Sequence, residues 1–101
     1  MSEADRQEAL AQTRQADPHA ALGCMQAFTD TDFREEMLDV RVPTLVIHGD
    51  GDKVVPFKGT GSLTHEYIPK SELVLLRDAP HGCIVSHRDE WNAAVIDFLG
   101  R

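Results

Sequence analysis

Three side chains that could act on protons follow the two most apolar stretches of the chain. Asp50 and Asp52 come soon after the run 42–47, and His81 follows the run 72–76. A carboxylate that hydrogen-bonds to an imidazole fixes its tautomer and stabilises the imidazolium, which is the acid–base half of a Ser-His-Asp triad. Histidine suits proton transfer because its charge changes near neutral pH. The sequence therefore indicates acid–base chemistry, provided that the fold brings Asp52 and His81 together.

The two apolar runs predict strands that place these residues. The run 42–47 is rich in β-branched residues and does not alternate, which is typical of a parallel strand buried on both faces. We expect a turn from Gly49 to Asp52, a helix from about Thr60 to Ile68 and a second strand over 72–76. The order predicts a right-handed crossover with parallel strands. Open α/β sheets carry their sites at the carboxyl ends of such strands, so we expect both loops side by side.

Helices are predicted on both sides of this unit. Ser2 and Asp5 have the spacing of a capping box for a helix that reaches about Gln15. Asp17-Pro18 predicts a second helix start, interrupted at residues 29–32, and Phe33 to Leu38 a further turn. We expect Ser86 to cap a last helix, in which an apolar stripe begins at Trp91 and Gly100 ends the pattern. The predicted domains are a helical segment, 1–40, and an α/β portion, 41–101.

Composition excludes several classes of partner. The chain has 101 residues and a net charge of −7, which argues against nucleic acid and against an anionic membrane surface. Cys24 and Cys83 lie too far apart in sequence for a C-x-x-C metal pair and form no disulfide framework. The start of the chain lacks the pattern of a secretory signal, and no apolar run is long enough to span a bilayer. We therefore expect a cytoplasmic protein without a nucleic-acid or membrane partner.

Two local sequences resemble the α/β-hydrolases. Residues 42–56, with His48-Gly49-Asp50-Gly51-Asp52 at their centre, resemble the acid-strand region, and Ala79-Pro80-His81-Gly82 resembles the catalytic histidine loop. The chain order, acid before histidine, is that of this family. The residues most resemble the cofactor-free haloperoxidase, perhydrolase and arylesterase branch, well over residues 17–101 and poorly over 1–16. The resemblance implies the C-terminal βαβα portion of an α/β-hydrolase parallel sheet, preceded by lid-region helices.

The resemblance also implies roles for individual residues. Asp52 matches the catalytic acid and His81 the general base, whereas Asp50 matches a residue of the turn. Val54 and Val55 match positions that line the acyl pocket and bind substrate. The implied activity is that of a serine hydrolase on a small carboxylic ester or acid, with perhydrolase or non-haem haloperoxidase activity also found in this branch. It implies no metal, haem or other cofactor.

The chain departs from the family pattern in one large respect. It contains no Gly-x-Ser-x-Gly elbow and no oxyanion-hole motif, so His81 has no serine to deprotonate. Two parallel strands also leave hydrophobic edges open. We therefore expect that the chain alone is inactive and pairs with a missing N-terminal portion, or associates with itself through the open edge. The alternatives are an inactive binding module and a truncated gene product.

Other interpretations of the same residues remain open. Asp50 and Asp52 could be turn residues that stabilise their own backbone. They could also form an Asp-x-Asp nucleophile for phosphoryl transfer, although His48 and Gly49 separate them from the apolar run. For His48 itself, packing or hydrogen bonding is favoured over catalysis. Cys83 is expected to fill space rather than to react.

Overall fold

The computed structural model describes all 101 residues. The contacts between these residues divide the chain into two units. The first unit is Met1–Phe33 and the second is Arg34–Arg101. The division at residue 40 that composition suggests stays a prediction. The two units are described separately below, since only the second carries the residues expected to act in chemistry.

The first unit holds two helices that begin at the predicted residues. α1 (Glu3–Arg14) has the full capping box: Asp5 N–H donates to Ser2 Oγ at 3.1 Å, and Ser2 N–H donates to the Asp5 carboxylate at 3.2 Å. α2 (Pro18–Asp30) starts where Asp17 accepts the N–H of the second helical residue at 2.9 Å. The expected interruption at residues 29–32 comes late, because the helix continues to Asp30. Neither helix contains a buried residue.

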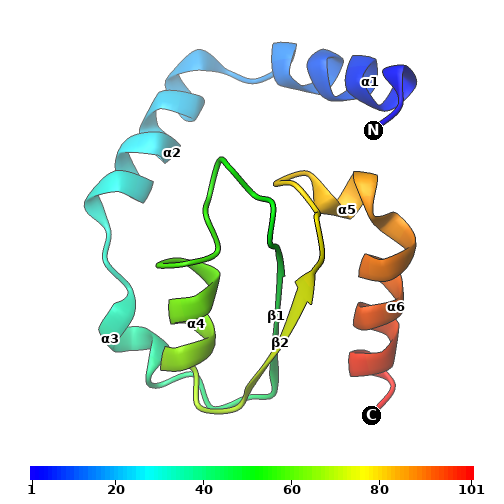
Figure 1. Ribbon diagram of the computed structural model, residues 1–101. Helices are drawn as coiled ribbons and strands as arrows, with labels where there is room; N and C mark the ends of the chain where they lie inside the picture. Colours follow the sequence, from blue (N-terminus) through cyan, green and yellow to red (C-terminus); the bar gives the residue numbers. More distant parts are fainter. The chain divides into compact units, whose positions relative to one another are not determined.

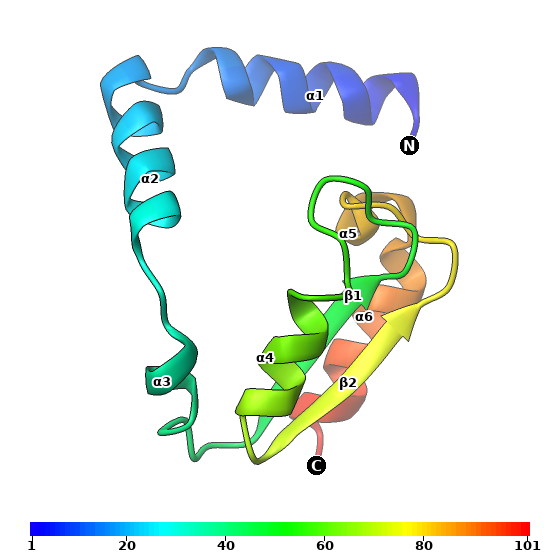
Figure 2. The same ribbon diagram turned by 60° about the vertical axis from the view of Figure 1, so that its left-hand side comes forward.

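The second unit is built on a two-stranded parallel sheet (Figure 1). After α3 (Arg34–Met37) come β1 (Thr44–Gly49), α4 (Gly61–Tyr67), β2 (Ser71–Leu76), α5 (Cys83–Ser86) and α6 (Arg88–Leu99). The register runs from Thr44 opposite Ser71 to Gly49 opposite Leu76. α4 and α6 cover opposite faces of the sheet, and each contacts both strands (Figure 2). The predicted βαβ crossover with parallel strands is confirmed.

Several boundaries differ from those predicted by one or two residues, and two of the differences change the place of a named residue. Gly49 belongs to β1 rather than to the turn, because it pairs with Leu76 and the next residue, Asp50, donates its N–H to Leu76 O at 3.0 Å. Ser86 does not cap the last helix: it ends α5, and α6 follows with His87 at its N-cap position and no side-chain cap. The Ser86 hydroxyl is instead 2.9 Å from His87 Nδ1. A short helix, α5, which the sequence did not predict, therefore precedes the last helix.

The sheet is less buried than its apolar strands predict. Of the strand residues only Val46, Gly49 and Leu76 are buried, and Glu72 and Leu75 are exposed. The expectation that both faces of both strands are buried is therefore wrong for this chain. A small core consists of buried Leu76, Ala79 and Cys83, against which Ile47, Val74 and Trp91 pack. Cys83 fills space there, as expected.

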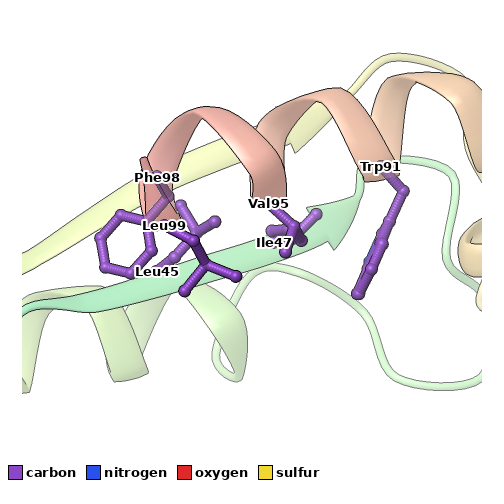
Figure 3. A pocket seen from close by; sticks show the side chains of 6 residues that line it. All are labelled: Leu45, Ile47, Trp91, Val95, Phe98 and Leu99. Carbon is purple, nitrogen blue, oxygen red and sulfur yellow. The ribbon is translucent and has the colours of Figure 1, made fainter. Parts of the chain in front are cut away.

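An apolar groove lies between β1 and α6 (Figure 3). It has a volume of about 390 Å³, and its lining comes from two strand residues and from the stripe predicted for the last helix: Leu45, Ile47, Trp91, Val95, Phe98 and Leu99. Leu99 is exposed at its end. None of the helices is both long and apolar enough to cross a membrane.

Candidate active site

The carboxylate of Asp52 is the best-anchored polar group at the carboxyl end of the sheet. One oxygen, Oδ1, accepts the backbone N–H groups of Val54 at 2.9 Å and of Val55 at 2.8 Å. The other oxygen, Oδ2, lies 2.8 Å from His81 Nδ1. Only 5% of the side chain is exposed. Asp52 is thus fixed from two sides, by its own turn and by an imidazole that lies 29 residues further along the chain.

The imidazole of His81 is oriented by this contact. Because an ionised carboxylate can only accept hydrogen bonds, Nδ1 carries the proton that His81 donates to Asp52. In the neutral ring, Nε2 is then the acceptor. The side chain is 56% exposed, and no protein group bonds to Nε2. His81 therefore presents a proton acceptor to the outside while its other nitrogen is tied to an acid.

Close backbone approach brings the two loops together. Ala79, which is fully buried, lies in the loop that leads to His81, and its carbonyl accepts the N–H of Gly51 at 3.0 Å. A Cβ atom at Gly49 would lie 2.2 Å from the same carbonyl oxygen. A residue larger than glycine at position 49 would push the turn that carries Asp52 (the acid turn) away from the loop that carries His81 (the histidine loop). The close approach of the Ala79 carbonyl thus explains why glycines stand on both sides of Asp50. The sequence alone does not reveal this contact.

The environment of Asp52 favours its charged form. Burial by itself would raise the pKa of Asp52, but the hydrogen bonds from Val55 N–H, His81 and Val54 N–H outweigh burial and lower the pKa below its ordinary value. The positive charge that His81 acquires on protonation acts in the same direction. Asp52 is therefore a carboxylate at neutral pH and can stabilise an imidazolium.

His48 supports the turn that carries Asp52 through its ring nitrogen Nε2. Its Nε2 lies 2.8 Å from Val55 O and 3.5 Å from Asp52 Oδ2. Since a carbonyl only accepts, Nε2 donates to Val55. The ring packs edge-on against Phe57, with 5.4 Å between centroids, and Gly61 leaves room for it. This agrees with the predicted role of His48 in packing and hydrogen bonding rather than in catalysis.

Val54 and Val55 contact the site through their main chains. Their N–H groups hold Asp52, while the Val54 side chain is 72% exposed. That these side chains line an acyl pocket stays a prediction. The backbone role was missed, although an aspartate followed by non-proline residues in a turn could have suggested it, since Asp side chains bond to N–H groups two and three residues on.

The serine hydroxyls of this unit bond elsewhere. Ser71 Oγ lies 2.8 Å from His65 Nδ1 and 2.8 Å from two backbone carbonyls, so its proton goes to a carbonyl and it is no nucleophile. Ser62 accepts a backbone N–H, and Ser86 contacts the histidine next to it. No group of three or more His, Cys, Asp or Glu residues is placed to hold a metal ion. The site thus consists of an acid and a base.

Known proteins resemble this chain over its whole length or most of it. No family model matches. A non-heme chloroperoxidase of Kitasatospora aureofaciens is 36% identical over 80 residues, which is 77% of this chain and 29% of that protein. A crystal structure of bromoperoxidase from Bacillus anthracis superposes with a TM-score of 0.95 at 42% identity, over 100% of this chain and 37% of that one. The chain belongs to the α/β-hydrolase superfamily.

As an α/β-hydrolase, the chain matches only part of its relatives. The bifunctional esterase/perhydrolase DCH of Acinetobacter calcoaceticus is 33% identical over 73 residues, which is 72% of this chain and 26% of that protein. The chain thus spans roughly a third of the length of these relatives. The match to the bromoperoxidase covers the whole chain and so includes residues 1–16, for which the sequence predicts only a poor resemblance. The fold is the C-terminal α/β portion of the superfamily, as the sequence predicts.

Proposed function

We propose that Asp52 and His81 are the acid and the general base of a Ser-His-Asp triad that hydrolyses carboxylic esters, and that the serine is supplied from outside these 101 residues. The 2.8 Å contact between His81 Nδ1 and Asp52 Oδ2 carries this proposal. It sits at the carboxyl ends of two parallel strands, where α/β enzymes place their sites, and it leaves His81 Nε2 open. The esterase and haloperoxidase names of the relatives support the same chemistry.

Each proton has a defined place in this reaction. His81 Nε2 takes the proton of the serine hydroxyl as the serine oxygen bonds to the ester carbonyl carbon. Asp52 holds the ring and stabilises the imidazolium that forms. When the tetrahedral intermediate collapses, the bond to the alcohol breaks and His81 returns its proton to the leaving oxygen. A water molecule, activated by the same nitrogen, then releases the acid and restores the serine.

Hydrogen peroxide can replace water in the second half of this cycle. The peroxide oxygen attacks the acyl carbon, His81 takes the peroxide proton, and the serine leaves with that proton while a peracid forms. The esterase/perhydrolase and chloroperoxidase names of the relatives favour this second nucleophile. Val54 and Val55, next to Asp52 in sequence, are the proposed contacts of the acyl group.

An N-terminal α/β portion that carries the serine is the partner proposed for this chain. The groove between β1 and α6 is lined by apolar side chains, and one edge of β1 has no neighbouring strand. Apolar surface of this kind is normally covered. A further strand could pair with this free edge of β1, and the loop at its carboxyl end would then lie beside the turn that carries Asp52.

A chimera tests the proposed function. The present chain is to replace the matched 37% of the Bacillus anthracis bromoperoxidase, to which it is 42% identical. We expect the chimera to hydrolyse nitrophenyl acetate and to be labelled by a fluorophosphonate probe. Asp52→Asn should lower kcat by about 10⁴-fold, because the imidazole then takes the wrong tautomer. His81→Ala should have a comparable effect.

Two controls make this test decisive. The 101-residue chain alone should show neither turnover nor labelling; either one would contradict the view that its nucleophile lies elsewhere. His48→Gln removes a histidine of the same unit and should leave far more activity than His81→Ala. A folded chimera in which His81→Ala keeps full activity would overturn the general-base assignment. A chain that folds alone but never complements the rest of the fold would favour the binding module.

A further inference from the structure

We infer that Asp50 is a positioning residue, which sets the histidine loop so that His81 Nδ1 meets Asp52. The inference deepens the proposed function and rests on it. The observation behind it is a hydrogen bond across the site: Asp78 N–H donates to the Asp50 carboxylate at 2.5 Å, over 28 residues of sequence. Asp50 therefore belongs to the acid turn but holds the opposite loop.

Asp78 occupies an unusual place in that loop. It has a φ of 57°, the only positive φ outside the glycines. Left-handed backbone is unfavourable for a residue with a Cβ atom, and asparagine and aspartate tolerate it best. It follows the end of β2 closely and lies three residues before His81. The direction in which the chain leaves the strand, and so the start of the histidine loop, is decided at this residue.

The Asp50 carboxylate is the group that stabilises this turn. It accepts the N–H of the left-handed residue, and a hydrogen bond to an ionised carboxylate is stronger than a neutral one. Two backbone bonds flank it: Asp50 N–H donates to Leu76 O, and Gly51 N–H donates to Ala79 O, each at 3.0 Å. Together the three bonds fix the loop at its beginning and in its middle. Of the three, only the bond to the Asp50 carboxylate involves a side chain, so only this bond is lost on substitution by alanine.

Asp50 and Asp52 thus share one turn but do different work. Asp52 faces the imidazole, whereas Asp50 faces the backbone on which the imidazole is carried. The hydrogen bond of the Asp50 carboxylate goes to Asp78 N–H, and that of His81 Nδ1 goes to Asp52. Loss of its carboxylate should release the loop and weaken the Asp52–His81 contact without removing either partner.

Nuclear magnetic resonance of the ¹⁵N-labelled chain tests this inference. Above the ordinary pKa of histidine, at about pH 8, the ring nitrogens report which tautomer is present. In the wild type, neutral His81 should be held in the Nδ1–H form with a downfield proton. In Asp50→Ala this proton signal should be lost and the tautomers should mix. Asp50→Asn, which keeps an acceptor oxygen, should retain the wild-type signals.

A matched control and a second measurement complete the design. Asp78→Asn removes one carboxylate from the same place but keeps the N–H donor and tolerates the left-handed conformation, so it should leave His81 unchanged. The Asp78 amide should exchange slowly in the wild type and fast in Asp50→Ala. If Asp50→Ala fails to fold, Asp50→Glu displaces the oxygens and should weaken the same signal.

Several results would overturn the inference. One is an unchanged His81 tautomer in folded Asp50→Ala or Asp50→Glu; another is an unprotected Asp78 amide in the wild type. A change in Asp78→Asn equal to that in Asp50→Ala would point to charge rather than to the hydrogen bond. None of these readings depends on turnover, so the triad could fail in the chimera while Asp50 still positions the loop, and the reverse also holds.

Discussion

The helices of the first unit and the paired loops of the second are held by contacts of different range. In α1 and α2 the stabilising side-chain bonds join near neighbours, such as Asp5 to Ser2 and Thr29 to Met25. In the second unit Asp52 meets His81, and Asp50 meets Asp78, across 29 and 28 residues. The first kind of contact needs only a local sequence, whereas the second needs a sheet that brings distant loops together.

The difference extends to burial. Neither α1 nor α2 has a buried residue, and the apolar side chains of α2, such as Leu22 and Phe28, are largely exposed. The second unit buries Leu76 and Ala79, which lie shortly before His81 in the sequence. A mutation at a helix cap should therefore destabilise only that helix. A mutation where the acid turn contacts the histidine loop should destabilise the whole second unit. The three predictions below set these two expectations against each other.

The largest effect is expected from Gly49→Ala. The new Cβ would lie 2.2 Å from Ala79 O, which is backbone and cannot rotate away. We expect a loss of about 4 kcal/mol or more, the range of severe mutations, and so unfolding of the second unit. Trp91 is the single tryptophan and packs against the core, so its fluorescence should report the loss.

Gly23→Ala in α2 is the matched control for this substitution. Nothing lies within 4 Å of a Cβ atom at Gly23. Because glycine is a poor residue for a helix interior, alanine should stabilise α2 by about 1 kcal/mol and leave the Trp91 signal as it is. If Gly49→Ala proved as harmless as Gly23→Ala, the close approach of the two loops would be wrong.

A smaller effect is expected from the charge of Asp52, and it depends on pH. The lowered pKa of Asp52 means that its carboxylate stabilises the fold above the unfolded pKa, at about 4, and that this stability is lost as the pH falls through the lower folded value. Asp52→Asn should therefore lower the melting temperature at pH 7 and flatten its fall below about pH 4. Thermal melts followed by Trp91 fluorescence measure both.

Asp39→Asn serves as the comparison for this pH dependence. Asp39 is an exposed residue of the same unit. Its replacement should leave the fall of the melting temperature below about pH 4, followed by Trp91 fluorescence, as steep as in the wild type. An equally steep acid fall in Asp52→Asn would show that other carboxylates cause it.

The range of the contacts also explains which parts of the structure could be predicted from the sequence. The starts of α1 and α2 were predictable because Ser2 and Asp17 cap their own helices, and β1 and β2 because their apolar runs are continuous. The approach of Asp52 to His81 followed from the parallel order of the strands. The Asp50–Asp78 bond could not be predicted, since it depends on the left-handed turn at Asp78. The prediction that Ser86 caps the last helix was wrong for a related reason, because the chain forms a short helix, with Cys83 in the core, before α6.

The smallest effect is expected from Ser2→Ala at the start of α1. The change removes the hydroxyl that accepts Asp5 N–H, whereas the backbone N–H of residue 2 keeps its acceptor, the Asp5 carboxylate. Loss of such a cap costs about 1 kcal/mol. The Cα chemical shifts of residues 3–14 should report reduced helicity, and Ser2→Asp, which is another good cap, should restore it. The Trp91 melt should stay unchanged in both variants. A lower melting temperature of Ser2→Ala, followed by Trp91 fluorescence, would mean that the first unit stabilises the second. The expectation that a helix cap acts only on its own helix would then be wrong.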